Sequence, residues 1–385
     1  MKSIDNGKFI LRRLKHNGYK AFFVGGCVRD YLLKEEVNDI DITTDATPKD
    51  VMRLFNKAIP TGLKYGTVTV LHEHNKIEVT TFRLDGEYSD SRHPDEVTLA
   101  DLETEDVKRR DFTINGLLMD ENYKIYDYVN GITDLNNKTI RAIGDPLKRF
   151  AEDALRMLRA LYFVSKLGFK IEKGTLEAIN EVAEKITLLP NERIANEMYK
   201  ILTGKHQNDG IKGLYESGLY KYLPGLEKGI EFIYNNISQN ISIDVFYSLC
   251  FYLNGEVSQE WKFSNIDRNK YNKVLELLEK HQEFNNFTLY EYGVEINILA
   301  NLVLYNLGKT ENKIGEIRYK SEKMPLRSLT DLKVRGNDIL NITNKKRGSW
   351  LSKLLDELAF KVLSGELKND KKVLLKYCEE QLNEE

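Results

Sequence analysis

The stretch Phe22–Asp41 constrains the fold more than any other part of the sequence. It reads FFVGGCVRDYLLKEEVNDID. The apolar run Ala21–Val24 predicts a buried strand, and the adjacent pair Gly25 and Gly26 predicts a turn, after which a short helix carrying an arginine is expected. A diglycine at a helix start lets backbone N–H groups approach an anion, and the helix dipole and Arg29 add positive charge. This turn is therefore a candidate phosphate site, although such turns are also common without any binding role.

Two carboxylates follow, with one residue between them. On a strand, Asp39 and Asp41 would project side by side, because residues i and i+2 of a strand point the same way. Like charges repel, so a bound divalent cation is a good reason for such a pair. Mg²⁺ in particular is held by one or two carboxylates plus substrate phosphates. The competing interpretation is a solvated loop or a helix cap. Together with the candidate phosphate site, the acidic pair indicates nucleotide chemistry.

Length and composition describe an ordinary protein of several domains. The chain has 385 residues, more than one hydrophobic core usually fills, so two to four domains are expected. Neither a membrane-spanning apolar run nor the apolar core of a signal peptide occurs, which predicts a cytoplasmic protein that is not inserted in a membrane. The cysteines Cys27, Cys250 and Cys378 are far apart, which fits reduced thiols and gives no zinc-binding spacing.

Charge is distributed unevenly along the chain. The net charge of −2 argues against a surface that binds polyanions indiscriminately. The segment Lys333–Lys376, however, holds 11 Lys and Arg against 5 Asp and Glu. This composition predicts one positive patch in the C-terminal part, and a solvated lysine-rich helix explains it equally well.

The hydrophobic pattern changes near residue 146. Before it, Thr67–His72 and Ile77–Phe82 alternate and are rich in β-branched residues, which predicts strands. After it, helical patterns dominate, so a mixed α/β part followed by a long all-α part is expected. Glu78 lies in the second of these strands and is a candidate third carboxylate beside the acidic pair, unless it is simply a surface residue of an edge strand. Residues 85–98 are polar and predict a long loop.

A candidate base-reading surface lies on Phe150–Phe169, which is predicted to form one continuous amphipathic helix. Asp153, Arg156 and Arg159 recur every third residue and would share a face. A carboxylate accepts a hydrogen bond from an exocyclic amine, and a guanidinium donates to a ring acceptor. Such a pair would accept cytosine and adenine and oppose guanine and uracil. The other interpretation is a ladder of exposed ion pairs on the helix surface.

Several motifs occur in a fixed order: GGCVRD, NDIDI, EVTTFR, RRDFTING and FAEDALRMLRAL. Together they resemble the class II tRNA nucleotidyltransferases, that is, the bacterial CCA-adding enzymes and their poly(A) polymerase relatives. The resemblance covers residues 20–170 closely and continues more loosely through 191–202. The later sequences VRGNDIL, KRGSW and LLDELAFKVLSGELKND resemble the C-terminal segment of the short bacterial members, which binds the tRNA elbow.

The resemblance implies an α+β architecture. A polymerase-β-like nucleotidyltransferase head of mixed sheet and helices, residues 1–145, would be followed by an elongated all-α part. That part would comprise a base-recognising neck at 146–205, a body at 206–325 and a tRNA-binding tail at 326–385. The implied activity is template-independent addition of C, C and A to the tRNA 3′ end from CTP and ATP, by two-metal nucleotidyl transfer with release of pyrophosphate. The implied cofactor is Mg²⁺, and no obligate protein partner is expected.

The resemblance also implies roles for individual residues. Asp39 and Asp41 would hold Mg²⁺, with Glu78 as a third catalytic acid. A second set would bind the nucleotide, through its phosphates and sugar or through its base: Gly25, Gly26, Arg29, Arg110, Asp153, Arg156, Arg159 and Tyr162. Within this set, Asp153 and Arg156 would template the incoming base.

Tyr162 departs from the family pattern. The family often has LRALRF at the end of the templating helix, whereas Tyr162 stands where the second arginine would be. Tyrosine can stack and donate one hydrogen bond, but it carries no charge. The polar segment 85–98 matches the flexible loop that, in this family, helps the switch from CTP to ATP, and it favours full CCA addition. The alternatives are an enzyme that adds only the terminal A, a poly(A) polymerase, and a catalytically silent RNA-binding scaffold.

Overall fold

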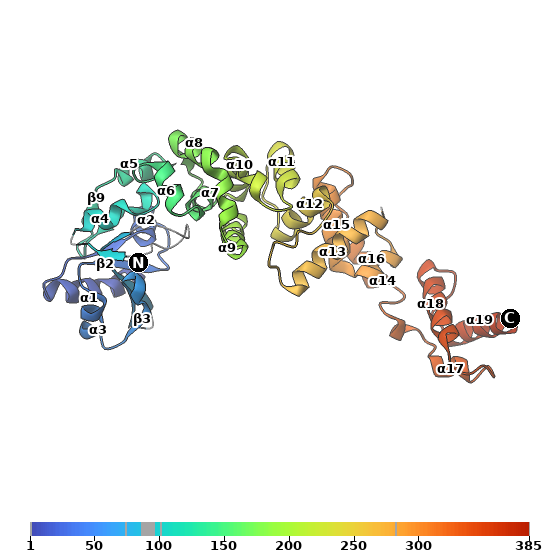
Figure 1. Ribbon diagram of the computed structural model, residues 1–385. Coiled ribbons are helices and arrows are strands. Elements are labelled where there is room, and N and C mark those ends of the chain that lie inside the picture. Colours follow the sequence, from blue (N-terminus) through green and yellow to red (C-terminus); the bar gives the residue numbers. More distant parts are fainter. Residues whose placement is uncertain (1, 74, 86–96, 101, 282, 385) are drawn as a thin grey trace. The chain divides into compact units, whose positions relative to one another are not determined.

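The computed structural model describes residues 2–73, 75–85, 97–100, 102–281 and 283–384, and these fall into two compact units (Figure 1). The first unit holds Met1–Asn240 together with Glu260–Lys262. The second holds Ile241–Gln259 together with Phe263–Glu385. Each unit is described by itself.

A seven-stranded mixed sheet forms the centre of the head, the N-terminal part of the first unit. Its strands run in the order β3-β4-β5-β2-β1-β8-β9. The β2–β5 pair is parallel and the other pairs are antiparallel, so β2 lies between one parallel and one antiparallel neighbour. The strand bounds are β1 (Ala21–Val24), β2 (Ile40–Thr44), β3 (Ala58–Gly62), β4 (Thr67–His72), β5 (Asn75–Thr81), β8 (Leu117–Met119) and β9 (Ile125–Asp127).

The predicted strands are confirmed, and two further features differ from the prediction. β1 and β4 have the predicted bounds, and β5 is shifted by one or two residues at each end. The edge strand β3 is not predicted, because Pro60 interrupts its pattern and proline is tolerated only at sheet edges. The predicted loop 85–98 is wrong at both ends, where β6 (Arg83–Asp85) and β7 (Val97–Leu99) form an antiparallel ribbon. Its middle, 86–96, lies outside the described residues.

Helices cover the sheet. Helix α1 (Lys2–His16) contacts β1 and β2 through a buried apolar stripe made of Ile10, Leu11 and Leu14. Gly7 permits this approach, because a Cβ at that position would collide with the ring of Phe23. The head also contains α2 (Gly26–Leu32), α3 (Pro48–Leu54), α4 (Glu103–Lys108) and α5 (Gly131–Asn136). Helix α3 begins after Thr47, whose hydroxyl oxygen accepts a hydrogen bond from the backbone N–H of Asp50.

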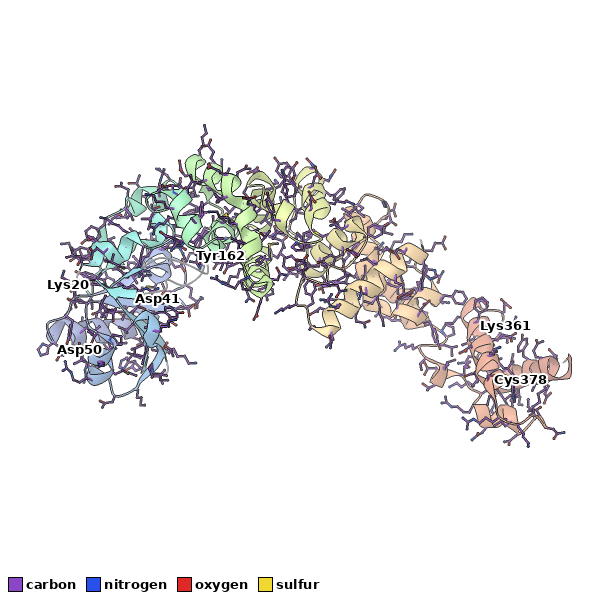
Figure 2. The ribbon with its side chains drawn as sticks, viewed as in Figure 1. Lys20, Asp41, Asp50, Tyr162, Lys361 and Cys378 are labelled. Carbon is purple, nitrogen blue, oxygen red and sulfur yellow. The ribbon has the colours of Figure 1, made fainter. Side chains whose placement is uncertain are left out.

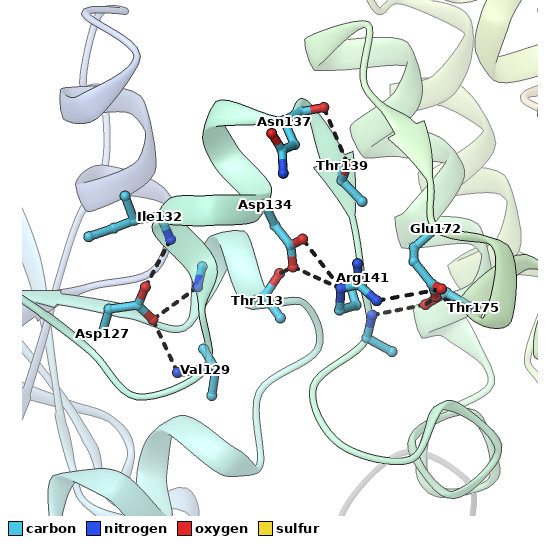
Figure 3. Close-up of polar contacts among 12 residues, drawn as sticks. Thr113, Asp127, Val129, Ile132, Asp134, Asn137, Thr139, Arg141, Glu172 and Thr175 are labelled. Carbon is cyan, nitrogen blue, oxygen red and sulfur yellow. Dashed lines mark hydrogen bonds and ion pairs between the residues drawn. The ribbon is translucent and has the colours of Figure 1, made fainter.

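A short ribbon joins the head to the following helices. β10 (Thr139–Ile140) pairs in parallel with β11 (Lys170–Ile171). Arg141 lies beside this ribbon, with Nε 3.1 Å from Oδ2 of Asp134 and Nη1 3.5 Å from Oε1 of Glu172 (Figure 3). The two carboxylates come from opposite sides of the junction, so Arg141 ties α5 to the segment that begins α8.

Helix α7 is the centre of the helical part of the first unit. It packs against α9 and α10 and buries Met157, Leu158 and Leu161. The helices of this part are α6 (Pro146–Glu152), α7 (Leu155–Leu167), α8 (Lys173–Val182), α9 (Asn191–Leu202), α10 (Gln207–Glu216) and α11 (Glu227–Asn236).

The prediction of one continuous helix over 150–169 is wrong, because the chain breaks at Asp153. The backbone of Asp153 is extended, with φ −142° and ψ 103°. Its Oδ1 accepts a hydrogen bond from the N–H of Leu155 at 3.0 Å. Aspartate competes in this way with helical hydrogen bonding, so the apolar pattern continues across the break while the helix does not.

The described residues of the second unit form helices without strands. One core contains the rings of Tyr247, Phe251, Phe263 and Tyr271, with centroids 5.0–6.0 Å apart. A separate apolar cluster joins the last helices, beside which Phe287 stacks on Phe360. The helices are α12 (Ile243–Asn254), α13 (Asn265–Lys280), α14 (Asn286–Tyr292), α15 (Val294–Asn306), α16 (Ile314–Lys323), α17 (Gly336–Leu340), α18 (Ser349–Ser364) and α19 (Lys371–Glu384).

The predicted α+β class is confirmed: a mixed-sheet head is followed by a part that is helical apart from the two-residue strand β11 in the described chain. The division into four domains, with its three boundaries, stays a prediction. Among the described helices, none is both long and apolar enough to cross a bilayer.

Candidate active site

A cavity of about 800 Å³ opens in the first unit where β1 leads into α2. Figure 2 marks Asp41, from β2, and Tyr162, from α7, both of which line it. Most of the predicted site residues are in its lining: Gly25, Gly26, Arg29, Asp39, Asp41, Arg110, Arg159 and Tyr162. Three predicted residues are not in the lining: Glu78, Asp153 and Arg156.

The sheet places Asp41 directly opposite Glu78 of β5. Burial raises the pKa of Asp41, Arg110 opposes this effect, and Glu78 and Asp39 raise the pKa further, to about 6. The three acids therefore lie close enough to repel one another. A bound cation would relieve that repulsion. Glu78 itself is exposed and is not in the cavity lining.

Asp39 does not lie on a strand, contrary to the prediction, although both carboxylates line the same cavity. β2 begins at Ile40, whose partner is Ile77, and Asp39 is exposed on the segment before it. The chain entering β2, rather than strand alternation, brings Asp39 into the cavity lining beside Asp41.

Gly25 forms a turn next to Asp41, and Arg110 places a positive charge near both. Gly25 has a φ of 75°, which side chains rarely permit, and a Cβ there would lie 3.6 Å from Nη1 of Arg110. Asp106 anchors Arg110, with Oδ2 2.9 Å from Nη2. Burial raises the pKa of Asp106, but Arg110 and Arg109 outweigh this and the pKa is about 2. Nε of Arg110 is buried without a hydrogen-bond partner among the described residues, so this guanidinium has donor capacity for a phosphate.

A chain of hydrogen bonds joins α2 to α7 along the cavity wall. Nη1 of Arg29 donates to Asn115 at 2.6 Å, and Asn115 donates to Asp111 at 3.1 Å. Nε and Nη2 of Arg159 donate to Oδ2 of Asp111 at 2.8 and 2.6 Å. Burial raises the pKa of Asp111, but Arg159 and Asn115 outweigh this and hold it at about 2. Asp111 and Asn115 line the cavity without having been predicted, although a polar residue directly after the arginine pair and another four residues later are a usable signal.

Asp153 and Arg156 lie outside the cavity lining. Arg156 is buried, and its Nη1 donates to Oε2 of Glu152 at 2.6 Å, while backbone carbonyl oxygens accept two further bonds at 3.1 Å. Because α7 begins only after Asp153, the predicted single helical face for the pair is wrong. The α7 residues that do face the cavity include Arg159 and Tyr162.

The acidic end fits a hard divalent cation that is held partly by substrate. No three Asp, Glu, His or Cys side chains form a complete metal-binding group within the described part of the chain. Asp39 and Asp41 nevertheless place two carboxylates in one cavity, and burial, with a smaller contribution from the charges of Glu78 and Asp39, raises the pKa of Asp41. Mg²⁺ takes such oxygen ligands and fills its other positions with water and substrate phosphates.

Family models match three parts of the chain. A poly A polymerase head domain matches residues 21–141, a probable RNA- and SrmB-binding site of polymerase A matches 168–230, and a putative tRNA nucleotidyltransferase domain 2 matches 243–378. The head match contains Asp39, Asp41, Arg29 and Arg110. Fold and site together define a nucleotidyltransferase with a poly(A) polymerase head.

Similarity to individual proteins extends over the whole chain. The CCA-adding enzyme of Staphylococcus epidermidis is 36% identical, covering 97% of both chains, and that of Bacillus licheniformis is 37% identical, covering 95% of both. The crystal structure of the Bacillus stearothermophilus CCA-adding enzyme in complex with CTP is 32% identical, with a TM-score of 0.80 over 99% of this chain and 98% of that one. This chain belongs to the family of CCA-adding enzymes.

Proposed function

We propose that this enzyme adds C, C and A to the 3′ end of tRNA from CTP and ATP, in the cytoplasm and without a nucleic-acid template. The observation that carries the proposal is the end-to-end similarity to CCA-adding enzymes, among them one solved with CTP. The cavity adds chemical support, because carboxylates, a glycine turn and arginines line one space.

The reaction forms one bond and breaks another. The RNA 3′ oxygen bonds to the α-phosphorus of the nucleotide, its proton passes to solvent, and the bond to the oxygen that bridges to the β-phosphate breaks, which releases pyrophosphate. Arg29 and Arg110 would offset charge on the phosphates, and the Gly25–Gly26 turn would let them approach the backbone. Positioning and electrostatics would supply most of the rate, as is usual for phosphoryl and nucleotidyl transfer.

We infer that Asp39 and Asp41 hold Mg²⁺, with Glu78 near enough to assist. The chemistry that the bound metal supplies in such sites is activation of the attacking hydroxyl and neutralisation of the leaving pyrophosphate. Arg110, anchored by Asp106, would keep a fixed positive charge beside the same carboxylates.

Base selection is assigned to Asp153 and Arg156, with Arg159 and Tyr162 supporting the nucleotide. Hydrogen bonding to the amino group and ring nitrogen of cytosine or adenine would favour these bases over guanine and uracil. To reach a base, Arg156 would exchange its hydrogen bonds to Glu152 and to two backbone carbonyls for bonds to the base.

The tail is assigned to tRNA binding. Lys345, Lys346 and Arg347 are exposed in succession, and the indole of Trp350 donates to the carbonyl of Lys346 at 2.8 Å, which closes this basic turn. Exposed cations in a row suit the phosphate backbone of a folded RNA.

The test uses three truncated tRNAs, ending at the discriminator base, at C and at CC. The purified enzyme with CTP, ATP and Mg²⁺ should complete all three to CCA. Extension of the CC-ended tRNA alone would mean an A-adding enzyme, and long adenosine tails would mean a poly(A) polymerase. The absence of any extension would refute the proposal.

A further inference from the structure

Four lysines from separate parts of the first unit line the cavity. Lys138 lies between α5 and β10, Lys166 lies on α7, Lys200 lies on α9, and Lys205 lies between α9 and α10. We call these four residues the lysine rim. They share the cavity with the acidic pair and the arginines.

The turn that carries Lys205 is held closely against α7. Gly204 packs so near Ser165 that any side chain at 204 would collide with it. The backbone N–H of His206 donates to the carbonyl of Ser165 at 2.7 Å, and the side chain of Asn240 donates to the carbonyl of Lys205 at 3.2 Å. The backbone of Lys205 is therefore fixed on both sides.

Lys138 is also presented on a fixed turn. Its φ is 53°, a left-handed conformation that is uncommon for a residue with a side chain. The carbonyl of Lys138 accepts a hydrogen bond from the N–H of Lys170 at 3.0 Å, and Thr139 donates to the carbonyl of Asn137 at 3.3 Å (Figure 3). The head–neck ribbon thus orients this lysine.

The rim is only partly neutralised by the protein. Lys166 lies 3.1 Å from Asp30, and Lys200 lies 2.7 Å from Glu197. Lys138 and Lys205 are exposed and have no carboxylate within ion-pair distance in the described chain. Two uncompensated cations, each on an anchored backbone, therefore line the cavity.

We propose that Lys138 and Lys205 bind the phosphate backbone of the RNA strand whose 3′ end enters the cavity, an inference that rests on the proposed function. The nucleotide phosphates have their own cations, Arg29 and Arg110, on the head wall. The segment 168–230, which carries Lys205, matches the RNA-binding model. Lysine binds phosphate as a flexible point charge without reading a base. This property suits a strand whose terminal residues change with each nucleotide added.

The test compares K138Q/K205Q with the control K57Q/K228Q, which removes the same charge from two exposed lysines of the first unit outside the cavity lining. The Kd of full-length protein for a CC-ended tRNA is measured by fluorescence anisotropy, without nucleotide, between about 50 and 200 mM salt. We expect Kd to rise about tenfold in K138Q/K205Q at low salt, and the slope of log Kd against log salt to fall by about 0.7 for each phosphate that no longer binds a lysine. The control should keep the wild-type slope.

The KM for ATP provides the discriminating measurement. If the rim binds nucleotide phosphates instead, the KM for ATP rises in K138Q/K205Q while the Kd for tRNA stays at the wild-type value, and the inference is overturned. A Kd and slope equal to those of the control also overturn it. The Kd for tRNA is measured without catalysis. A wild-type enzyme that binds tRNA but adds no nucleotide would therefore refute the proposed function, while the comparison of Kd values would still test the role of Lys138 and Lys205.

Discussion

The acidic end of the cavity and the α7 end are built in different ways. Asp41 lies on a strand whose register with β5 sets it opposite Glu78. Arg159 lies on a helix whose start depends on the capping bond of Asp153. At the first end, strand pairing across the sheet positions the carboxylates. At the second, a hydrogen bond between residues two apart decides which side chains face the cavity. Long-range pairing and local capping thus control the two halves of one site.

The two ends also differ in how their charges are compensated. Asp41 is under-compensated, since its pKa is raised to about 6 even with Arg110 nearby. Two donors of Arg159 bond to Oδ2 of Asp111, and Arg156 bonds to Glu152. The acidic end therefore gains most from an added cation, whereas the arginine end is held in place by its own carboxylates.

The largest effect is expected at the acidic end. Asp41→Asn keeps the size of the side chain and removes its charge, so incorporation of ATP into CC-ended tRNA should fall by roughly a thousandfold or more. Asp39→Ala should act in the same direction. Binding of tRNA should stay within about twofold of the wild type, because phosphate contacts elsewhere dominate RNA affinity. Substantial residual turnover in Mg²⁺ would contradict the assignment of these carboxylates to the metals.

The next effect concerns the arginine end and is expected in stability. Asp111→Asn leaves Arg159 without its carboxylate, which should lower the free energy of unfolding by about 2–3 kcal/mol in a urea titration. Because the folded pKa of Asp111 is about 2, below the usual value near 4, its contribution is complete above pH ~4 and is lost as the pH falls toward 2. The free energy of unfolding of the variant should therefore change less than that of the wild type between about pH 4 and pH 2. Asp209→Asn, at an exposed site, is the matched control and should leave both measurements unchanged.

Features that depend on neighbouring residues are predictable from the sequence, whereas features that depend on pairing between distant residues or on a single capping bond are not. The bounds of β1 and β4 follow from runs of neighbouring residues, so they are predictable. The start of β2 depends on the pairing of Ile40 with Ile77, and for that reason Asp39 is misplaced by one residue. The apolar pattern over 150–169 gives no sign of the helix break at Asp153, because an aspartate that caps a helix does not interrupt the spacing of the apolar residues. The partnership of Arg159 with Asp111, 48 residues away, has no local signal.

A selectivity experiment addresses the α7 end directly. Asp153→Ala removes the proposed acceptor for the amino group of cytosine or adenine, so discrimination against UTP and GTP should weaken by about tenfold, measured as ratios of kcat/KM. The substitution also removes a helix cap, which costs about 1 kcal/mol of stability. Asp145→Ala is the matched control, because Asp145 caps α6 through a similar 3.0 Å bond to Leu147. It should lose a similar amount of stability, apart from the contribution of the ion pair that Asp153 forms with Arg193 at 3.4 Å, and keep full selectivity.

Unchanged selectivity in Asp153→Ala would move the base-reading role along α7 to Arg159 and Tyr162, the residues that line the cavity. Tyr162 is then the residue to vary, since Lys200 lies 5.7 Å from its ring and supplies a cation that tyrosine lacks. A loss of selectivity in Tyr162→Ala with retention in Tyr162→Phe would indicate stacking rather than hydrogen bonding.

The smallest effect is expected for Glu78→Gln. Glu78 is exposed and outside the cavity lining, but its charge raises the pKa of Asp41 from the neighbouring strand. Removing that charge should change kcat by less than about fivefold and raise the Mg²⁺ concentration needed for half-maximal activity by a similar factor, because one carboxylate fewer attracts the ion. A loss as large as that of Asp41→Asn would instead make Glu78 a full metal ligand. The acidic end would then be built by two strands in register, and Asp39, which precedes the strand, would be the dispensable carboxylate.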